Sequence, residues 1–251
     1  MGLAGAGQAP DKTAVTSGAP AAKSGWHFLL ELYVMFPNMN GNVAVGRLPP
    51  SNINLKPGDI FSHFQIGAML YFEASNEHWV ISSDVLYMDL SGDADSIFRV
   101  LQGHAEMKQL GWEVAFLRKI NPWLSAGIGF QLNDIQSDIS LTKDSGRVPF
   151  QQSGSLTKTW VDPSLILAVK LPLGQGGKWD FRGRGNIGGF GIGSKIYWQV
   201  QAYFDYHVSK LFQVSLGYRA IKMDYETGSE KDYFLYNLVT FGPVVRFGFN
   251  F

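Results

Sequence analysis

Apolar and polar residues alternate with a period of two along most of this chain. Between Val239 and Phe251 every odd position is apolar, whereas the even positions are small or polar apart from Val244. Successive side chains of a β-strand point to opposite faces of the sheet, so this segment is predicted to be a strand with one apolar, aromatic face. Residues 195–208 and the segments that open at Trp26 and Ile60 show the same pattern.

Ten segments of this kind can be counted, and most of them contain eleven or more residues. They cover roughly residues 26–37, 60–74, 78–90, 102–118, 122–134, 159–172, 178–189, 194–208, 211–225 and 234–251. Strands of soluble proteins usually have about five or six residues, whereas a tilted strand that crosses a bilayer needs about 9–11. The lengths predict an all-β fold, a closed antiparallel transmembrane β-barrel of about ten strands (8–12) with up-and-down topology. A soluble barrel or sandwich is the alternative.

The connections between the segments alternate between short and long. Tight joins follow the second, fourth, sixth and eighth segments, and the stretch 135–158 is the longest and most polar connection. Outer-membrane barrels have short turns on the periplasmic side and longer loops outside. An even number of strands then places both termini in the periplasm, opposite the 135–158 loop and the Gly188–Gly193 hairpin. Short extra strands in 37–59 and 91–103 remain open.

Tryptophan recurs where segments begin. An aromatic girdle is expected at such positions in a membrane barrel, and its predicted members are Trp26, Trp79, Trp123, Trp160 and Trp179.

Composition narrows the remaining possibilities. Lys+Arg and Asp+Glu are both 21, so the formal net charge of zero gives no electrostatic case for nucleic acid. Cysteine is absent, which excludes disulfides and thiolate metal sites. No stretch approaches the roughly 20 apolar residues of a membrane helix. Residues 1–25, rich in Ala, Gly, Pro and Ser, are predicted to be a flexible N-terminal tail before a barrel domain over 26–251.

Residues 182–195, RGRGNIGGFGIGSK, contain the pattern G-x-G-x-x-G at Gly183, Gly185 and Gly188. A dinucleotide site needs a buried strand before these glycines and a helix opening on them. Both flanks of the run instead alternate with a period of two. The run is therefore interpreted as the end of one strand and the hairpin into the next, where glycine permits bulges and positive φ. No cofactor is predicted.

The C-terminal third also resembles a known family. NIGGFGIGSKIYWQ, SLGYR at 215–219, DY at 224–225, FGP at 241–243 and WVDPSL at 160–165 resemble a largely uncharacterised family of Gram-negative outer-membrane β-barrel proteins. The resemblance covers about 160–251 well and the N-terminal half only in rhythm. It implies the bacterial outer membrane as location, the lipid bilayer, lipopolysaccharide and other envelope proteins as partners, and a terminal phenylalanine, Phe251, that the barrel-assembly machinery reads.

If the apolar faces contact lipid, the polar alternates point into the lumen. That places charges of both signs inside, and such charges are costly unless they are paired or hydrated. A salt-bridged network that fills the lumen is therefore predicted, with Arg246 in contact with Glu31 or Asp205. Its members are Glu31, Asp84, Glu113, Asp162, Lys170, Arg182, Arg184, Asp205, Arg219 and Arg246.

Two classes of function follow from this interpretation. One is a structural or interaction component of the envelope with a plugged lumen, and the other is a narrow channel for small polar solutes. An outer-membrane enzyme is a third hypothesis. It has little support, because the five histidines are scattered without metal-ligand spacing and no G-x-S-x-G occurs. His104 with Glu106 and Asp95 is the best of the poor candidates, so no catalytic and no metal residue is predicted.

Overall fold

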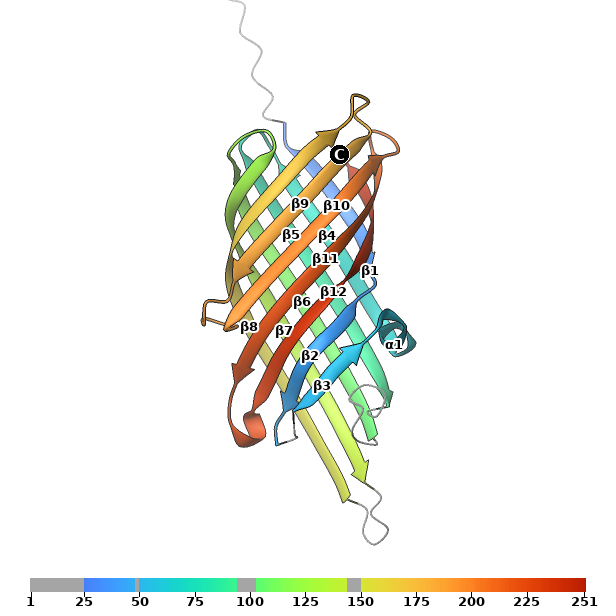
Figure 1. Ribbon diagram of the computed structural model, residues 1–251, viewed down its shortest axis with the longest axis vertical. Coiled ribbons are helices and arrows are strands. Elements are labelled where there is room, and N and C mark those ends of the chain that lie inside the picture. Colours follow the sequence, from blue (N-terminus) through green and yellow to red (C-terminus); the bar gives the residue numbers. More distant parts are fainter. Residues whose placement is uncertain (1–24, 48–49, 94–102, 144–149) are drawn as a thin grey trace, which may run out of the picture.

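The computed structural model describes residues 25–47, 50–93, 103–143 and 150–251, which form a tall barrel of tilted antiparallel strands (Figure 1). The described residues form twelve strands and two short helices. Their bounds are β1 His27–Met35, β2 Asn38–Val45, β3 Ser51–Leu55, α1 Pro57–Ser62, β4 Phe64–Ser75, β5 Trp79–Asp93, β6 Gly103–Lys119, β7 Leu124–Lys143, β8 Phe150–Leu173, β9 Trp179–Gly188, β10 Ile196–His207, β11 Phe212–Thr227, η1 Glu230–Asp232 and β12 Phe234–Asn250. Of the predicted tail, only Gly25 lies within the described residues.

The barrel closes where the last strand meets the first. Strands β4 to β12 pair with their neighbours in chain order, and β12 then pairs with β1 from Asn250↔Leu29 to Val244↔Met35. β2 continues along β12 beyond β1, from Phe241↔Asn38 to Phe234↔Val45. β1 and β2 therefore form one barrel strand, and β3, α1 and β4 together occupy the next position. Counted in this way, the wall has ten strands, as the alternation predicts.

The outer surface of the wall is apolar in the way that the sequence pattern requires. On β12, Phe247 and Phe249 are 45% and 46% exposed, whereas Val244 and Arg246 at the alternate positions are 1% and 2% exposed. The apolar band ends, on the side away from the termini, at outward polar contacts such as the ion pair between Asp89 and Lys108. Among the described residues, no helix is long and apolar enough to cross a membrane.

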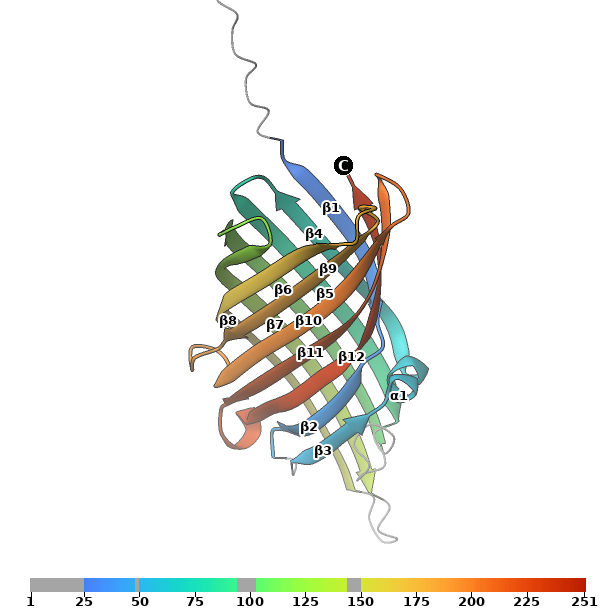
Figure 2. The same cartoon turned by 45° about the horizontal axis from the view of Figure 1, so that its top comes forward.

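The two ends of the barrel differ as predicted. The C-terminus and the start of β1 lie at one end, here the terminal end, together with the short β4–β5, β6–β7, β8–β9 and β10–β11 turns (Figure 1). The end of β7, the start of β8 and the β9–β10 connection lie at the opposite, distal end. Figure 2 shows the same layout from a second direction, with the β7–β8 hairpin projecting furthest.

Two regions differ from the sequence-based expectation. Most of the predicted 135–158 loop is strand, because β7 and β8 pair continuously from Leu124↔Val169 to Lys143↔Phe150. Beyond the apolar band the outer face of β7 becomes polar at Asp134 and Gln136, whereas Ile135 is buried on the inner face. The alternation of the lipid-facing segments therefore does not continue into this hairpin. The second segment was predicted to begin as a strand at residue 60, but α1 occupies 57–62. The open question of extra strands is answered in 37–59 by β2 and β3, whereas 94–102 lie outside the described residues.

Candidate functional site

A belt of buried charge crosses the middle of the lumen. Four carboxylates and four guanidinium groups point inward from eight positions on seven strands, so the belt is balanced in charge. Its members are Glu31, Asp84, Glu113, Asp205, Arg182, Arg184, Arg219 and Arg246. Period two places each of them on the inner face, and the ion pairs offset the cost of removing them from water.

Glu31 on β1, fully buried, is the hub on the terminal side of the belt. Its Oε1 accepts a hydrogen bond from Nη2 of Arg182 at 2.6 Å, and its Oε2 accepts one from Nη1 of Arg246 at 2.9 Å. Arg182 also forms an ion pair with Asp205, with 2.5 Å between Nε and Oδ2. The predicted contact of Arg246 with Glu31 is therefore present, and Asp205 is bound by Arg182 instead.

The guanidinium of Arg246 lies in a cage of tyrosines. Its central carbon is 4.7 Å, 5.0 Å and 4.2 Å from the ring centres of Tyr33, Tyr71 and Tyr203. Cation–π attraction strengthens in such a desolvated setting. Nη2 also donates to the Tyr203 hydroxyl at 2.8 Å, so Arg246 has polar partners at its rim and aromatic faces around it.

Two further clusters complete the belt. Tyr33 donates to Oδ1 of Asp84 at 2.6 Å and accepts from Arg219 at 2.9 Å, while Nη1 of Arg219 lies 3.3 Å from Oδ2 of Asp84. On the β6 side, Arg184 and Asn186 both donate to the carboxylate of Glu113. These contacts join β1, β5, β6, β9 and β11 across the lumen rather than along the wall.

Asp162 belongs to a different structure, the glycine-rich β9–β10 turn. Its Oδ1 accepts from the Ser194 backbone N–H at 2.5 Å, and its Oδ2 accepts from the Ser194 hydroxyl at 2.7 Å and from Trp160 Nε1 at 3.0 Å. A Cβ on Gly193 would lie 2.4 Å from the Val161 carbonyl oxygen. The motifs WVDPSL and GGFGIGS are therefore hydrogen-bonded to each other. This agrees with the interpretation of the glycines as a turn between two barrel strands.

Trp160 corrects the predicted girdle. It is 6% exposed and points into the lumen, where its ring stacks on Tyr225 with 4.0 Å between the ring centres. The side chains of Trp26, Trp79, Trp123 and Trp179 are between 40% and 49% exposed, and all four lie near the terminal end. Trp160 instead precedes Asp162 by two residues on β8, so the period of two gives it the same inward face.

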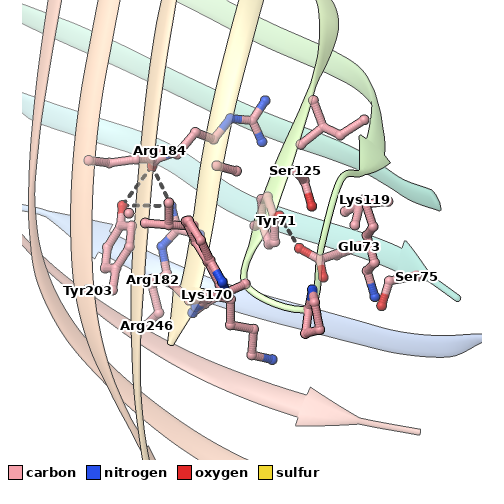
Figure 3. A pocket seen from close by; sticks show the side chains of 18 residues that line it. Tyr71, Glu73, Ser75, Lys119, Ser125, Lys170, Arg182, Arg184, Tyr203 and Arg246 are labelled. Atoms are coloured by element: carbon pink, nitrogen blue, oxygen red, sulfur yellow. Dashed lines mark hydrogen bonds between the residues drawn. The ribbon is translucent and has the colours of Figure 1, made fainter. Parts of the chain in front are cut away.

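Lys170 also lies outside the belt. Its side chain is 59% exposed, and its Nζ is 3.7 Å from Asp180. It lines a pocket of about 140 Å³ that opens at the terminal end and has belt arginines in its wall (Figure 3). In this pocket Tyr71 donates to Glu73 at 2.6 Å. Lys119 adds a further cation. The pocket stops at the belt, since Arg182 and Arg246 in its wall are bound to Glu31.

The lumen on the distal side of the belt is mainly apolar, a feature that the sequence analysis did not predict. The polar residues in its lining are Gln109, Thr240, Asp59, His63, Glu106 and Ser137. Two cavities of about 40 Å³ each lie there and share Leu238 as a lining residue. Apart from Met1, every methionine of the chain lines one of them: Met35, Met69, Met88 and Met223 line the first, and Met39 and Met107 the second. We call this region the apolar chamber. Inward methionines interrupt the polar face of the pattern, and that interruption was the available signal.

The other predicted residues lie near the two ends. Phe251 pairs with Phe28 through two backbone hydrogen bonds, and its side chain is 65% exposed. At the distal end Lys195 donates to Glu226, which holds the pKa of that carboxyl below its ordinary value. Asp95 and the side chain of His104 lie outside the described residues. Within the described ranges, no three His, Asp or Glu side chains gather as a metal site.

Comparison with known proteins supports the fold. No protein-family model and no curated sequence matches the chain. The structure is similar to the outer-membrane protease OmpT from Escherichia coli, with a TM-score of 0.54, 9% identity, and coverage of 91% of this chain and 98% of OmpT. Ail, the attachment invasion locus protein of Yersinia pestis, gives a TM-score of 0.39 at 11% identity, covering 91% of this chain and 99% of Ail. At such identities the OmpT likeness shows the barrel fold alone.

Proposed function

We propose that this protein is a bacterial outer-membrane barrel with a sealed lumen, a structural or interaction component of the envelope that does not conduct. The observation that carries the proposal is the charge belt. Its four arginines and four carboxylates are matched within the lumen, and ion pairs span it from β1 to β9 and from β5 to β11. An ion crossing the barrel would have to separate these pairs in a confined space, at a high electrostatic cost.

The outer surface supports the membrane placement. Its apolar band runs between the four exposed tryptophans at the terminal end and the distal outward ion pairs, as expected for a barrel that contacts the bilayer and lipopolysaccharide. On this placement the terminal end faces the periplasm, and the exposed Phe251 is available to the barrel-assembly machinery. OmpT is a protease, but no catalytic group is carried over to this chain from a likeness of fold.

Single-channel recording in planar bilayers tests the seal. The purified wild-type protein is expected to give no steady conductance at low voltage. The double variant Glu31→Ala/Arg246→Ala removes one charge of each sign from the belt and is expected to open a conducting path. Arg47→Ala/Glu230→Ala is the matched control, because it deletes an exposed ion pair of 3.0 Å at the distal end. Steady conductance of the wild type would instead support the narrow channel for small polar solutes.

A further inference from the structure

The barrel wall is split on one side, next to the apolar chamber. β1 pairs with β4 only from His27↔Ser75 to Leu32↔Leu70, and β2 pairs with β3 only from Met39↔Leu55 onward. Among the described residues, no ladder pair joins the first and second barrel strands between these two points. α1 lies beside this gap (Figures 1 and 2). We call the gap the split.

Residues at the split are apolar and exposed. The rings of Phe36, Phe61 and Phe64 form a chain, with centres 5.5 Å and 6.1 Å apart, that links β1, α1 and β4. Ile66 is 60% exposed, and positions 64–68 are exposed on both faces of β4. A strand with an unpaired edge in the wall accounts for this exposure.

The split leads into the apolar chamber. Met35 and Pro37 lie on one side of the split and Met69 on the other, and all three line the first cavity. Ile60 on α1 is 3% exposed and lines the second cavity. The chamber is bounded by the charge belt on the terminal side. On the distal side it is covered by β2 and β3, which are polar outside and apolar inside: Asn52 donates to Asn42 on the outer face, whereas Met39 and Ile53 are buried.

The lining favours an adaptable apolar ligand. Thioether side chains are flexible and polarisable, and they are frequent where a surface must fit more than one apolar shape. Six methionines line the two small cavities, and four of them are buried. This lining is therefore suited to a ligand that enters by changing their rotamers. The split continues the lipid-facing surface, since Leu32 and Val34 on its terminal side are outward and exposed.

We propose that the apolar chamber receives a hydrocarbon chain of an outer-leaflet lipid, which enters sideways through the split between β1 and β4. The headgroup remains at the interface near α1, and the belt prevents the chain from passing to the terminal side. The inference rests on the membrane placement in the proposed function, but not on the absence of conductance.

Photolabelling tests this proposal. The protein is reconstituted in phosphatidylethanolamine–phosphatidylglycerol vesicles that contain palmitic acid with a diazirine at its methyl end, irradiated, and mapped by peptide mass spectrometry. Neighbouring residues of one strand report opposite faces: Met88 and Leu238 point into the chamber, and Tyr87 and Val239 point outward. We expect adducts on both faces. Adducts on the outward residues alone would overturn the proposal, whereas their absence from both faces would contradict the membrane placement.

The route of entry is tested by closing the split. The chain has no cysteine, so Phe36→Cys/Phe61→Cys can be bridged selectively with a short bifunctional thiol reagent. The same variant without the reagent is the matched control. Its adducts on Met88 and Leu238 show that the two substitutions alone leave the barrel folded. Bridging is expected to abolish the adducts on Met88 and Leu238 while those on Tyr87 and Val239 persist. Inward adducts that survive the bridge would overturn lateral entry.

Discussion

The two halves of the lumen use the same geometry for opposite chemistry. On the terminal side, inward positions hold ion pairs that are satisfied across the barrel, such as Arg182 with Glu31. On the distal side, inward positions hold methionines and aromatic rings around two cavities. The ion pairs of the charged half depend on the direction and distance between their atoms. The packing of the apolar half depends mainly on the total volume of its side chains. Rigidity and closure therefore belong to the first half, and adaptability to the second.

The largest expected effect comes from breaking the charged half. Arg246→Ala leaves Glu31 short of one partner and empties the tyrosine cage. Removing one member of a buried ion pair typically costs about 3–5 kcal/mol, because the other charge is left uncompensated. The free energy of unfolding, measured by guanidinium titration in detergent, should fall by that amount.

Lys170→Ala is the control for this variant. It also removes an inward cation, but one whose side chain is 59% exposed and whose ion pair with Asp180 is screened by water. Its stability should stay close to that of the wild type. Equal losses for the two variants would show that the belt contributes no more than a hydrated surface pair.

Breaking the apolar half should cost less. Leu238→Ala enlarges the space between the two cavities, and truncation of a buried leucine costs about 2–3 kcal/mol where neighbours can relax into the gap. No charge is left unpaired, so the planar-bilayer recording should remain silent. Val239→Ala changes the next, outward residue and controls for strand propensity. A variant of Leu238 as damaging as Arg246→Ala would contradict the adaptability of the chamber.

The sequence predicted the wall and the belt, because a period of two fixes which face each residue takes, whatever its neighbours. Ring closure in chain order was enough to bring Glu31 to Arg246. The alternation did not predict the split, because β2 and β3 have only eight and five residues and Pro37 separates β1 from β2, so no long alternation marks them. The extension of β7 and β8 was missed for the related reason that its outer face is polar, so the apolar alternation of the preceding segment does not continue into it.

Trp160 shows a different limit. Its position two residues before Asp162 already assigned it to the inner face, but its place at the start of a predicted segment favoured a girdle. The segment began earlier than expected, since β8 starts at Phe150. The error in the start of β8 therefore placed Trp160 in the girdle instead of the lumen. The assignment of Trp160 by its face of the strand was correct.

The smallest expected effect lies in the glycine-rich β9–β10 turn at the distal end. In Gly193→Ala the new Cβ would lie 2.4 Å from the Val161 carbonyl oxygen and 2.6 Å from Oδ1 of Asp162, so the turn must move away from β8. Overpacking of this kind costs about 1–3 kcal/mol. Gly185→Ala, in the same run but with no heavy atom within 4 Å of its Cβ, is the matched control and should be neutral. If both variants unfold at the wild-type guanidinium concentration, the contact between the turn and β8 adds no stability, and Asp162 binds Ser194 without constraining the barrel.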